Sequence, residues 1–120
     1  MLPLPEDFDV SVFLGRRVEL VCFSANTLTI HFDRDIAITS EATLIHERVA
    51  EGRTERTEQV VPAERSGLMQ LIGPAVVAAH VAGSADLIFE FEDGQILRVV
   101  EHPMPYESYH IRLGDRELHV

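Results

Sequence analysis

The stretch TLTIHFDRDIAI, residues 27–38, decides which fold this chain can adopt. Apolar side chains occupy every second position on both sides of an Arg34-Asp35 turn: Leu28, Ile30, Phe32, Ile36 and Ile38. Successive side chains of a β-strand point to opposite faces, so a period of two is typical of a half-buried strand. The stretch therefore predicts two antiparallel strands joined by a tight turn. Leu28, Ile30 and Phe32 would face inward and His31 out, and Ile36 and Ile38 would begin the second of the two strands.

The same alternation continues on both sides of this stretch. It predicts further strands in residues 16–23, 75–82, 86–92, 95–101, 106–113 and 116–120. Asp93-Gly94 and Gly114-Asp115 mark two hairpin turns, because glycine readily adopts the positive φ that a tight hairpin requires. Pro103 and Pro105 interrupt the alternation, since proline has no N–H to donate to a neighbouring strand.

One segment has a helical spacing instead. PAERSGLMQLIG, residues 62–73, begins with proline and ends with glycine, and Leu68, Leu71 and Ile72 lie three and four residues apart. We therefore expect one short helix near residues 62–72. The preceding residues 41–61 fit two structures: ATLIHERVA suits a strand or the start of a helix, and Gly52 indicates a turn or a mobile loop.

The pattern also repeats along the chain. Leu14-Gly15 resembles Ile72-Gly73, and three groups of residues follow in the same order. They are Val18, Leu20 and Cys22 with Val76, Ala78 and His80; Leu28, Ile30 and Phe32 with Leu87, Phe89 and Phe91 after one inserted residue; and Ile36 and Ile38 with Leu97 and Val99 after two more. An internal duplication would produce two three-stranded meanders linked by the helix, and chance alternation would produce the same pattern.

These observations predict one domain over residues 1–120, of the β-rich α+β class. About eight strands in antiparallel meanders would form a curved sheet or open barrel, with one short helix near residues 62–72.

The closing segment YESYHIRLGDRELHV, residues 106–120, follows an FEDG turn at residues 91–94. Together with Leu14, Gly15 and Val18, these segments resemble a group of small, uncharacterised bacterial β-rich proteins. Those proteins open with LxGxxV and close with FxDG followed by YESYxIxxGDxxIxV. The resemblance implies the β-rich fold; the group has no assigned activity, so it implies no catalytic residue.

The charge of the chain is strongly negative. Asp and Glu number 20 against 10 cationic residues, all arginine, for a net charge of −10. Such a chain repels phosphate backbones, which argues against a nucleic-acid partner. It is compatible with a basic protein partner, and equally with a charge that serves solubility alone.

The first ten residues have neither the basic nor the apolar region of a signal peptide. No apolar run approaches the roughly 20 residues that a membrane span needs. We therefore expect a cytoplasmic protein with no membrane partner.

Motifs that carry familiar chemistry are absent from the sequence. It contains no HExxH, CxxC, GxSxG or GxGxxG, and its six histidines show no compact ligand spacing, so we expect no metal and no cofactor. Cys22, the one cysteine, lies in the alternating segment 16–23 together with Val18 and Leu20. This pattern favours a small core residue over a reactive thiolate, which needs exposure and nearby positive charge.

The closing segment is the best candidate for a binding surface. The predicted binding residues are Glu101, His102, Tyr106, Ser108 and His110. Tyr106, Ser108 and His110 would share the outer face of a strand, with Tyr109 and Ile111 inward. Tyrosine suits an interface because it combines a large contact area with a polar tip, although a buried tyrosine at a sheet edge is equally normal.

The sequence therefore favours a non-enzymatic cytoplasmic protein-binding or interaction protein. One version is an immunity-type protein that covers a basic partner. The alternative is a small-ligand-binding protein or small enzyme with a pocket near Tyr106 and His110, and a pure oligomerisation module is a third interpretation. Pairing of the closing hairpin, residues 108–120, between two copies predicts a homodimer.

Overall fold

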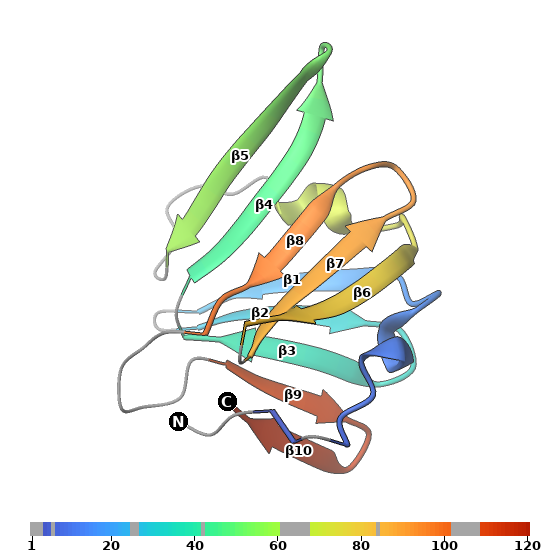
Figure 1. Ribbon diagram of the computed structural model, residues 1–120, viewed down its shortest axis with the longest axis vertical. Helices are drawn as coiled ribbons and strands as arrows, with labels where there is room; N and C mark the ends of the chain where they lie inside the picture. Colours follow the sequence, from blue (N-terminus) through green and yellow to red (C-terminus); the bar gives the residue numbers. More distant parts are fainter. Residues whose placement is uncertain are drawn as a thin grey trace.

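The computed structural model describes residues 4–5, 7–24, 27–41, 43–60, 68–83, 85–101 and 109–120. Within these residues ten strands form two antiparallel sheets of five, and neither sheet closes into a barrel (Figure 1). The first sheet contains, in spatial order, β1 (Val18–Phe23), β2 (Leu28–Phe32), β3 (Ile36–Ser40), β9 (Tyr109–Leu113) and β10 (Arg116–His119). The second contains β5 (Arg53–Val60), β4 (Thr43–Ala50), β8 (Ile96–Val99), β7 (Asp86–Phe91) and β6 (Val76–Ala82).

The predicted number of strands was too low, because residues 43–60 of the ambiguous segment 41–61 form a long hairpin. β4 and β5 pair from Thr43↔Val60 to Ala50↔Arg53, around a turn at Glu51 and Gly52 that both have positive φ. Residues 53–58 of β5 are all exposed, so they show no apolar alternation from which a strand could be predicted. Gly52 therefore marks a hairpin turn.

The predicted helix is also wrong in its described part. Only a single 3-10 turn, η2 (Leu68–Leu71), forms there, and residues 61–67 lie outside the described residues. Gly73, at φ 113°, follows the turn in a conformation that residues with a side chain rarely adopt. A second 3-10 turn that the sequence analysis missed, η1 (Val10–Phe13), is capped by the Asp9 side chain, which accepts from the Ser11 N–H.

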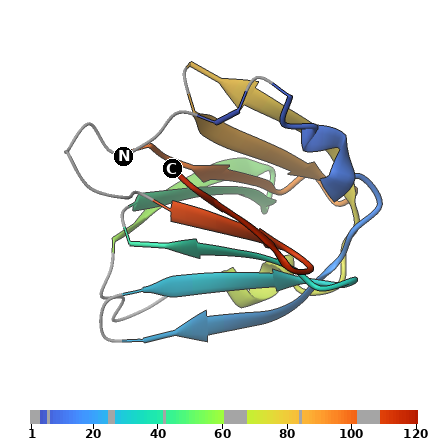
Figure 2. The ribbon, with the colours of Figure 1, turned by 90° about the horizontal axis from the view of Figure 1, so that it is seen from below.

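The two halves of the chain exchange their hairpins. Each half forms a three-stranded meander, β1–β2–β3 or β6–β7–β8, and the meanders lie in opposite layers (Figure 2). The β4–β5 hairpin of the first half then pairs with β8, and the β9–β10 hairpin of the second half pairs with β3. Each sheet is thus completed by strands from the other half, which joins the layers through backbone hydrogen bonds.

Strand register aligns the two halves residue by residue. Ile30 pairs with Ile38 in the first meander, and Phe89 pairs with Leu97 in the second. If Ile30 matches Phe89, as the sequence suggests, then Ile38 matches Leu97. The sequence match of Ile36 with Leu97 was therefore two residues out of register, because the turns after Phe32 and Phe91 have the same length.

The corner where the meanders meet has the same hydrogen bonds in both directions. The Gly15 N–H donates to the Val76 carbonyl at 2.9 Å, and the Gly73 N–H donates to the Val18 carbonyl at 3.2 Å. A side-chain carboxylate repeats this reciprocity, since Asp33 accepts from the Arg17 N–H at 3.2 Å and Glu92 accepts from the Ala75 N–H at 3.1 Å. A β-bulge also follows Val18 in β1 and Val76 in β6.

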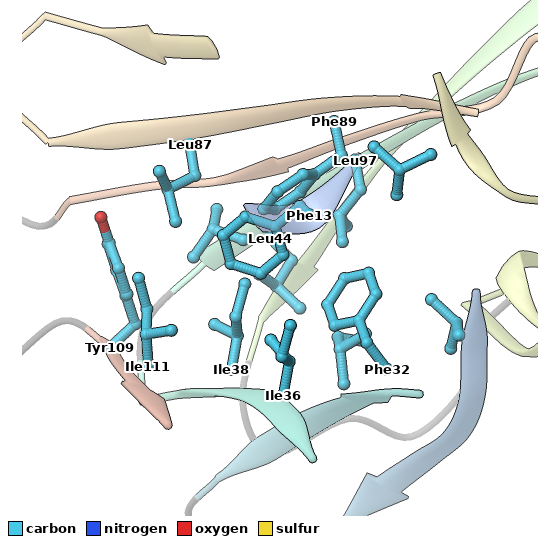
Figure 3. Close-up of a cluster of buried hydrophobic side chains, with 14 of the residues drawn as sticks. Phe13, Phe32, Ile36, Ile38, Leu44, Leu87, Phe89, Leu97, Tyr109 and Ile111 are labelled. Carbon is cyan, nitrogen blue, oxygen red and sulfur yellow. The ribbon is translucent and has the colours of Figure 1, made fainter. Parts of the chain in front are cut away.

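The core lies between the two layers. Figure 3 shows side chains from both sheets pointing toward one another, with Phe13 among them. The Phe13 ring makes edge-to-face contacts with Phe89 and Phe32, at centroid distances of 4.7 and 5.4 Å. The predicted inward positions Leu28, Ile30 and Phe32 are confirmed as buried. The other alternating apolar residues of the two meanders are buried as well: Ile36, Ile38, Leu87, Phe89 and Phe91.

The bulge in β1 corrects the placement of Cys22. The register shifts between Val18 and Leu20, so the side chains after the bulge change faces. Val18 is buried and Val21 packs against the core, whereas Cys22 pairs with Thr29 on the outer face and is partly exposed. Cys22 is therefore not a core residue.

Candidate functional site

Each sheet has a hollow of about 220 Å³ on the face that points away from the core. The hollow of the first sheet, here called the histidine hollow, is lined by Thr29, His31, Ala37, Thr39, His110, Arg112 and Glu117. The hollow of the second sheet, here called the isoleucine hollow, is lined by Ile45, Glu47, Arg56, Ile88, Ile96 and Arg98.

The two hollows occupy equivalent places in the two sheets. Ala37 of β3 lies between His31 on β2 and Arg112 on β9. Its counterpart Ile96 of β8 lies between Glu90 on β7 and Glu47 on β4. The strand order therefore creates both hollows, and the side chains alone make one polar and the other apolar.

The histidine hollow is surrounded by short polar contacts. On its floor the Thr29 and Thr39 hydroxyls are 3.0 Å apart. On its rim the His110 and His119 rings lie 5.4 Å apart, and a salt bridge of 3.3 Å joins Arg112 to Asp35. Its imidazole, hydroxyl, guanidinium and carboxylate groups could hydrogen-bond a small polar ligand.

The isoleucine hollow has an apolar floor with a charged rim. Ile45, Ile88 and Ile96 lie on three adjacent strands, β4, β7 and β8, of which β8 is central, and they point outward and are half-buried. At the rim, the Arg98 guanidinium donates to Asp86 Oδ2 from Nε at 2.9 Å and from Nη2 at 2.6 Å. These two hydrogen bonds hold the Arg98 guanidinium and the Asp86 carboxylate beside the half-buried isoleucines.

A buried polar network lies on the inner side of the same sheet. His46 and Gln95 are only 4% and 6% exposed, and His46 Nε2 lies 2.8 Å from Gln95 Oε1. Gln95 Nε2 donates to the Gln70 carbonyl and to Asp93 Oδ2, both at 2.7 Å. Because that amide nitrogen donates twice, Oε1 accepts from His46, and the network ties β4, β8 and η2 together.

The predicted binding residues are only partly placed by the structure. His102, Tyr106 and Ser108 lie outside the described residues. His110 points outward into the histidine hollow, as its predicted face implies, while Tyr109 and Ile111 are buried as expected. Glu101 donates its N–H to Asp86 Oδ1 at 2.8 Å.

Tyr109 separates Glu101 from His110. Its side chain points toward the opposite sheet, where the hydroxyl donates to the Ala85 carbonyl (Figure 3). Burial first, and then the negative charges of Asp86 and Glu101, raise the pKa of this phenol well above its usual value. Glu101 therefore lies near the inward-pointing hydroxyl, whereas His110 lies on the outer face, and the structure does not bring these two predicted residues together.

The residues of the isoleucine hollow were missed by the sequence analysis. The available signal was a pair of adjacent apolar residues in each strand: Leu44-Ile45, Leu87-Ile88 and Ile96-Leu97. A half-buried strand should place a polar residue at one of each pair. The outward isoleucines are therefore apolar positions that the core does not require.

Two classes of site are not seen in the described part of the chain. These residues include no group of three histidine, cysteine or acidic side chains placed to hold a metal ion. None of their helices is long and apolar enough to cross a membrane. Comparison of the chain with protein-family models, curated proteins and solved structures finds no match in any of the three.

Proposed function

We propose that this protein is a non-enzymatic binding module that docks a basic protein partner on the isoleucine hollow. The observation that carries the proposal is the row of Ile45, Ile88 and Ile96 on the outer face of a sheet, ringed by charged groups. An outer face that serves solubility alone needs no row of apolar side chains. An apolar centre with a polar rim is the usual anatomy of a protein–protein interface.

The charge of the molecule favours a basic partner. Six arginines of the described chain form salt bridges with acids: Arg16, Arg17, Arg48, Arg56, Arg98 and Arg112. With 20 acids against 10 arginines, the excess charge resides on carboxylates that no arginine can neutralise. This field would speed encounter with a basic protein and repel acidic ones. An immunity-type protein that covers a basic enzyme is one concrete version of this function.

Site-specific photo-crosslinking in cells that express the protein tests the proposal. A photoreactive residue replaces Ile88, and in a matched control it replaces Thr29, the equivalent position in the histidine hollow. We expect a discrete adduct with a basic protein from position 88 and none from position 29. Ile88→Glu should abolish the complex. Adducts of equal yield from both positions, or none from position 88, would contradict the proposal.

The histidine hollow supports a second candidate function, the binding of a small polar ligand. His31 and His110 line this hollow, and in the described part of the chain neither imidazole has a hydrogen-bond partner. Both histidines are half-buried, and a ligand in the hollow would supply hydrogen-bond partners to their rings. Imidazole NMR shifts of His31 and His110 should then respond to a metabolite mixture while those of exposed His80 do not. Equal responses of all three would exclude a specific site.

The reciprocal corner supports an origin of the two halves by duplication. The matched hydrogen bonds, the matched bulges and the exchanged hairpins are all explained by two copies of one unit. A chain built from two tandem copies of residues 68–120 should then fold as a monomeric β-protein by circular dichroism and sedimentation. A disordered product would count against equivalent halves.

A further inference from the structure

β6 is an edge strand with an unusual composition. In the described part of the chain its one strand neighbour is β7, so its other edge presents backbone groups without a strand partner. Its sequence, VVAAHVA, contains no acid and no arginine. Val77 and Val81 are 58% and 41% exposed. An uncharged, apolar edge of this kind is a template for pairing with another strand.

The other edge strands are protected by charge. β5 carries charged residues along its whole exposed length, and β10 has four residues of which two, Arg116 and Glu117, are charged. Charges on an edge oppose the approach of another strand. The closing hairpin therefore forms a sheet edge as predicted, but it is a poor choice for self-pairing.

β1, the counterpart of β6 in the first sheet, is also protected by charge. Glu19 occupies the bulge of β1, and Val77 occupies the bulge of β6. A charged residue in a bulge is a common device for blocking an edge. The β1 edge therefore has a charged residue in its bulge, and the β6 edge has an apolar residue at the same place.

Among the described residues, backbone hydrogen bonds cover the first part of the β6 edge only. The Val76 N–H donates to the Arg16 carbonyl at 2.9 Å, and its carbonyl accepts from Gly15. η1 packs beside this point, and two further exposed apolar side chains lie there, Val12 of η1 and Leu14 directly after it. The edge from Val77 to Ala82 and this apolar border therefore form one patch, here called the β6 patch, that carries no acid and no arginine and whose ionisable side chain, His80, lies 3.0 Å from Glu90 of β7.

We propose that the β6 patch is a homodimer interface, in which β6 pairs antiparallel with β6 of a second copy. Two molecules that each carry a net charge of −10 repel one another, so they approach best where neither presents charge. A basic partner would instead be drawn to carboxylates, which this patch lacks. Antiparallel pairing of a strand with itself is self-complementary about a two-fold axis. The second sheets of two copies then form one continuous sheet.

Sedimentation of the full chain over a concentration series tests the interface. We expect a monomer–dimer equilibrium that Val81→Lys weakens by about ten-fold or more, because a charge buried without a partner is costly. Leu20→Lys is the matched control, since Leu20 is comparably exposed on the β1 edge and should leave self-association unchanged. Sedimentation of the wild type as a monomer at high micromolar concentration would overturn the proposal.

Hydrogen exchange on the wild type provides a test that does not depend on a variant folding. Amides of residues 78–82 should become more protected as protein concentration rises, while those of β5 should not. Protection of this segment that is independent of concentration would mean that the chain covers its own edge, and would overturn the proposal. A dimer lost with Leu20→Lys but kept with Val81→Lys would do the same.

Discussion

The first and second sheets share a backbone plan and differ on both faces. Strand order, bulges and corner hydrogen bonds are the same in the two. On the outside, one sheet presents histidines where the other presents isoleucines. On the inside, the strand register shows that the first sheet has Ile36 and Ile111 at the positions where the second sheet has Gln95 and His46. The comparison teaches that the ladder and the turns define the sheet, and that each face can then change its chemistry separately.

The largest expected effect comes from the ring that both sheets share. Phe13→Ala removes the aromatic side chain between Phe32 and Phe89 and should cost about 4 kcal/mol in unfolding free energy, since the cavity cannot collapse fully. Urea denaturation measures the change. Phe23→Ala, at a residue that is 47% exposed, is the control and should cost about 1 kcal/mol or less. Similar costs at both positions would mean that the sheets do not depend on Phe13.

The buried polar network gives the next largest effect. Gln95→Leu leaves the His46 Nε2 donor unpaired and should cost about 1–3 kcal/mol. The double change of His46 and Gln95 to isoleucine copies Ile111 and Ile36 of the first sheet. It should restore most of the loss, because both polar partners leave together. Chemical denaturation of the single and double variants decides this, and a double variant worse than Gln95→Leu would show that the faces are not interchangeable.

The turns offer a smaller test. Asp35 has φ 61°, and its counterpart in the second sheet is Gly94, at φ 90°. Asp35→Gly relieves about 1 kcal/mol of backbone strain but loses the exposed ion pair to Arg112, which contributes about 0–1 kcal/mol. The net change in unfolding free energy should therefore lie within about 1 kcal/mol of zero. Arg112→Ala measures the contribution of the ion pair separately. If Asp35→Gly lowers the unfolding free energy much more than Arg112→Ala does, the two turns are not equivalent.

The corner carboxylate gives the smallest effect, which depends on pH. The N–H of Ala75 first, and then Arg17, lower the pKa of Glu92 below its usual value. A lowered folded pKa means that the carboxylate stabilises the corner fully above the ordinary glutamate pKa, and that this contribution disappears as the pH falls through the lowered value. Carbon-13 NMR titration should report the low pKa, and Arg17→Ala should raise it. If the Glu92 carboxyl of the wild type titrates at the ordinary glutamate pKa, the predicted stabilisation of the corner is wrong.

Much of the fold could be predicted from alternation alone. Leu28, Ile30 and Phe32 are buried as their spacing implies, and the turn at Asp93-Gly94 lies where glycine permits it. Prediction failed at β5, whose exposed polar residues carry no burial signal, and at Cys22, where a bulge reverses the faces. A bulge adds one residue to the ladder of one strand, and no single residue type announces it.

The candidate site was less predictable than the fold. The outward direction of His110 followed from its place in β9, but its neighbour His31 in the hollow comes from β2, which is far from β9 in the sequence. Glu101, nine residues before His110, lies near the Tyr109 hydroxyl instead. Proximity in the chain therefore misled, because adjacent strand residues point to opposite faces.

Alternation in the sequence is enough to predict that strands form, that Leu28, Ile30 and Phe32 are buried and that Asp93-Gly94 and Gly114-Asp115 turn the chain, because these features depend on neighbours a few residues apart. Only the three-dimensional structure shows that β6 is an edge strand and which hairpin completes which sheet. Those choices depend on backbone pairing between distant segments, such as β4 with β8 and β3 with β9, and a ladder hydrogen bond is made by every residue type except proline. Residue identity therefore carries little information about the partner strand, and the two hollows and the open β6 edge follow from that pairing.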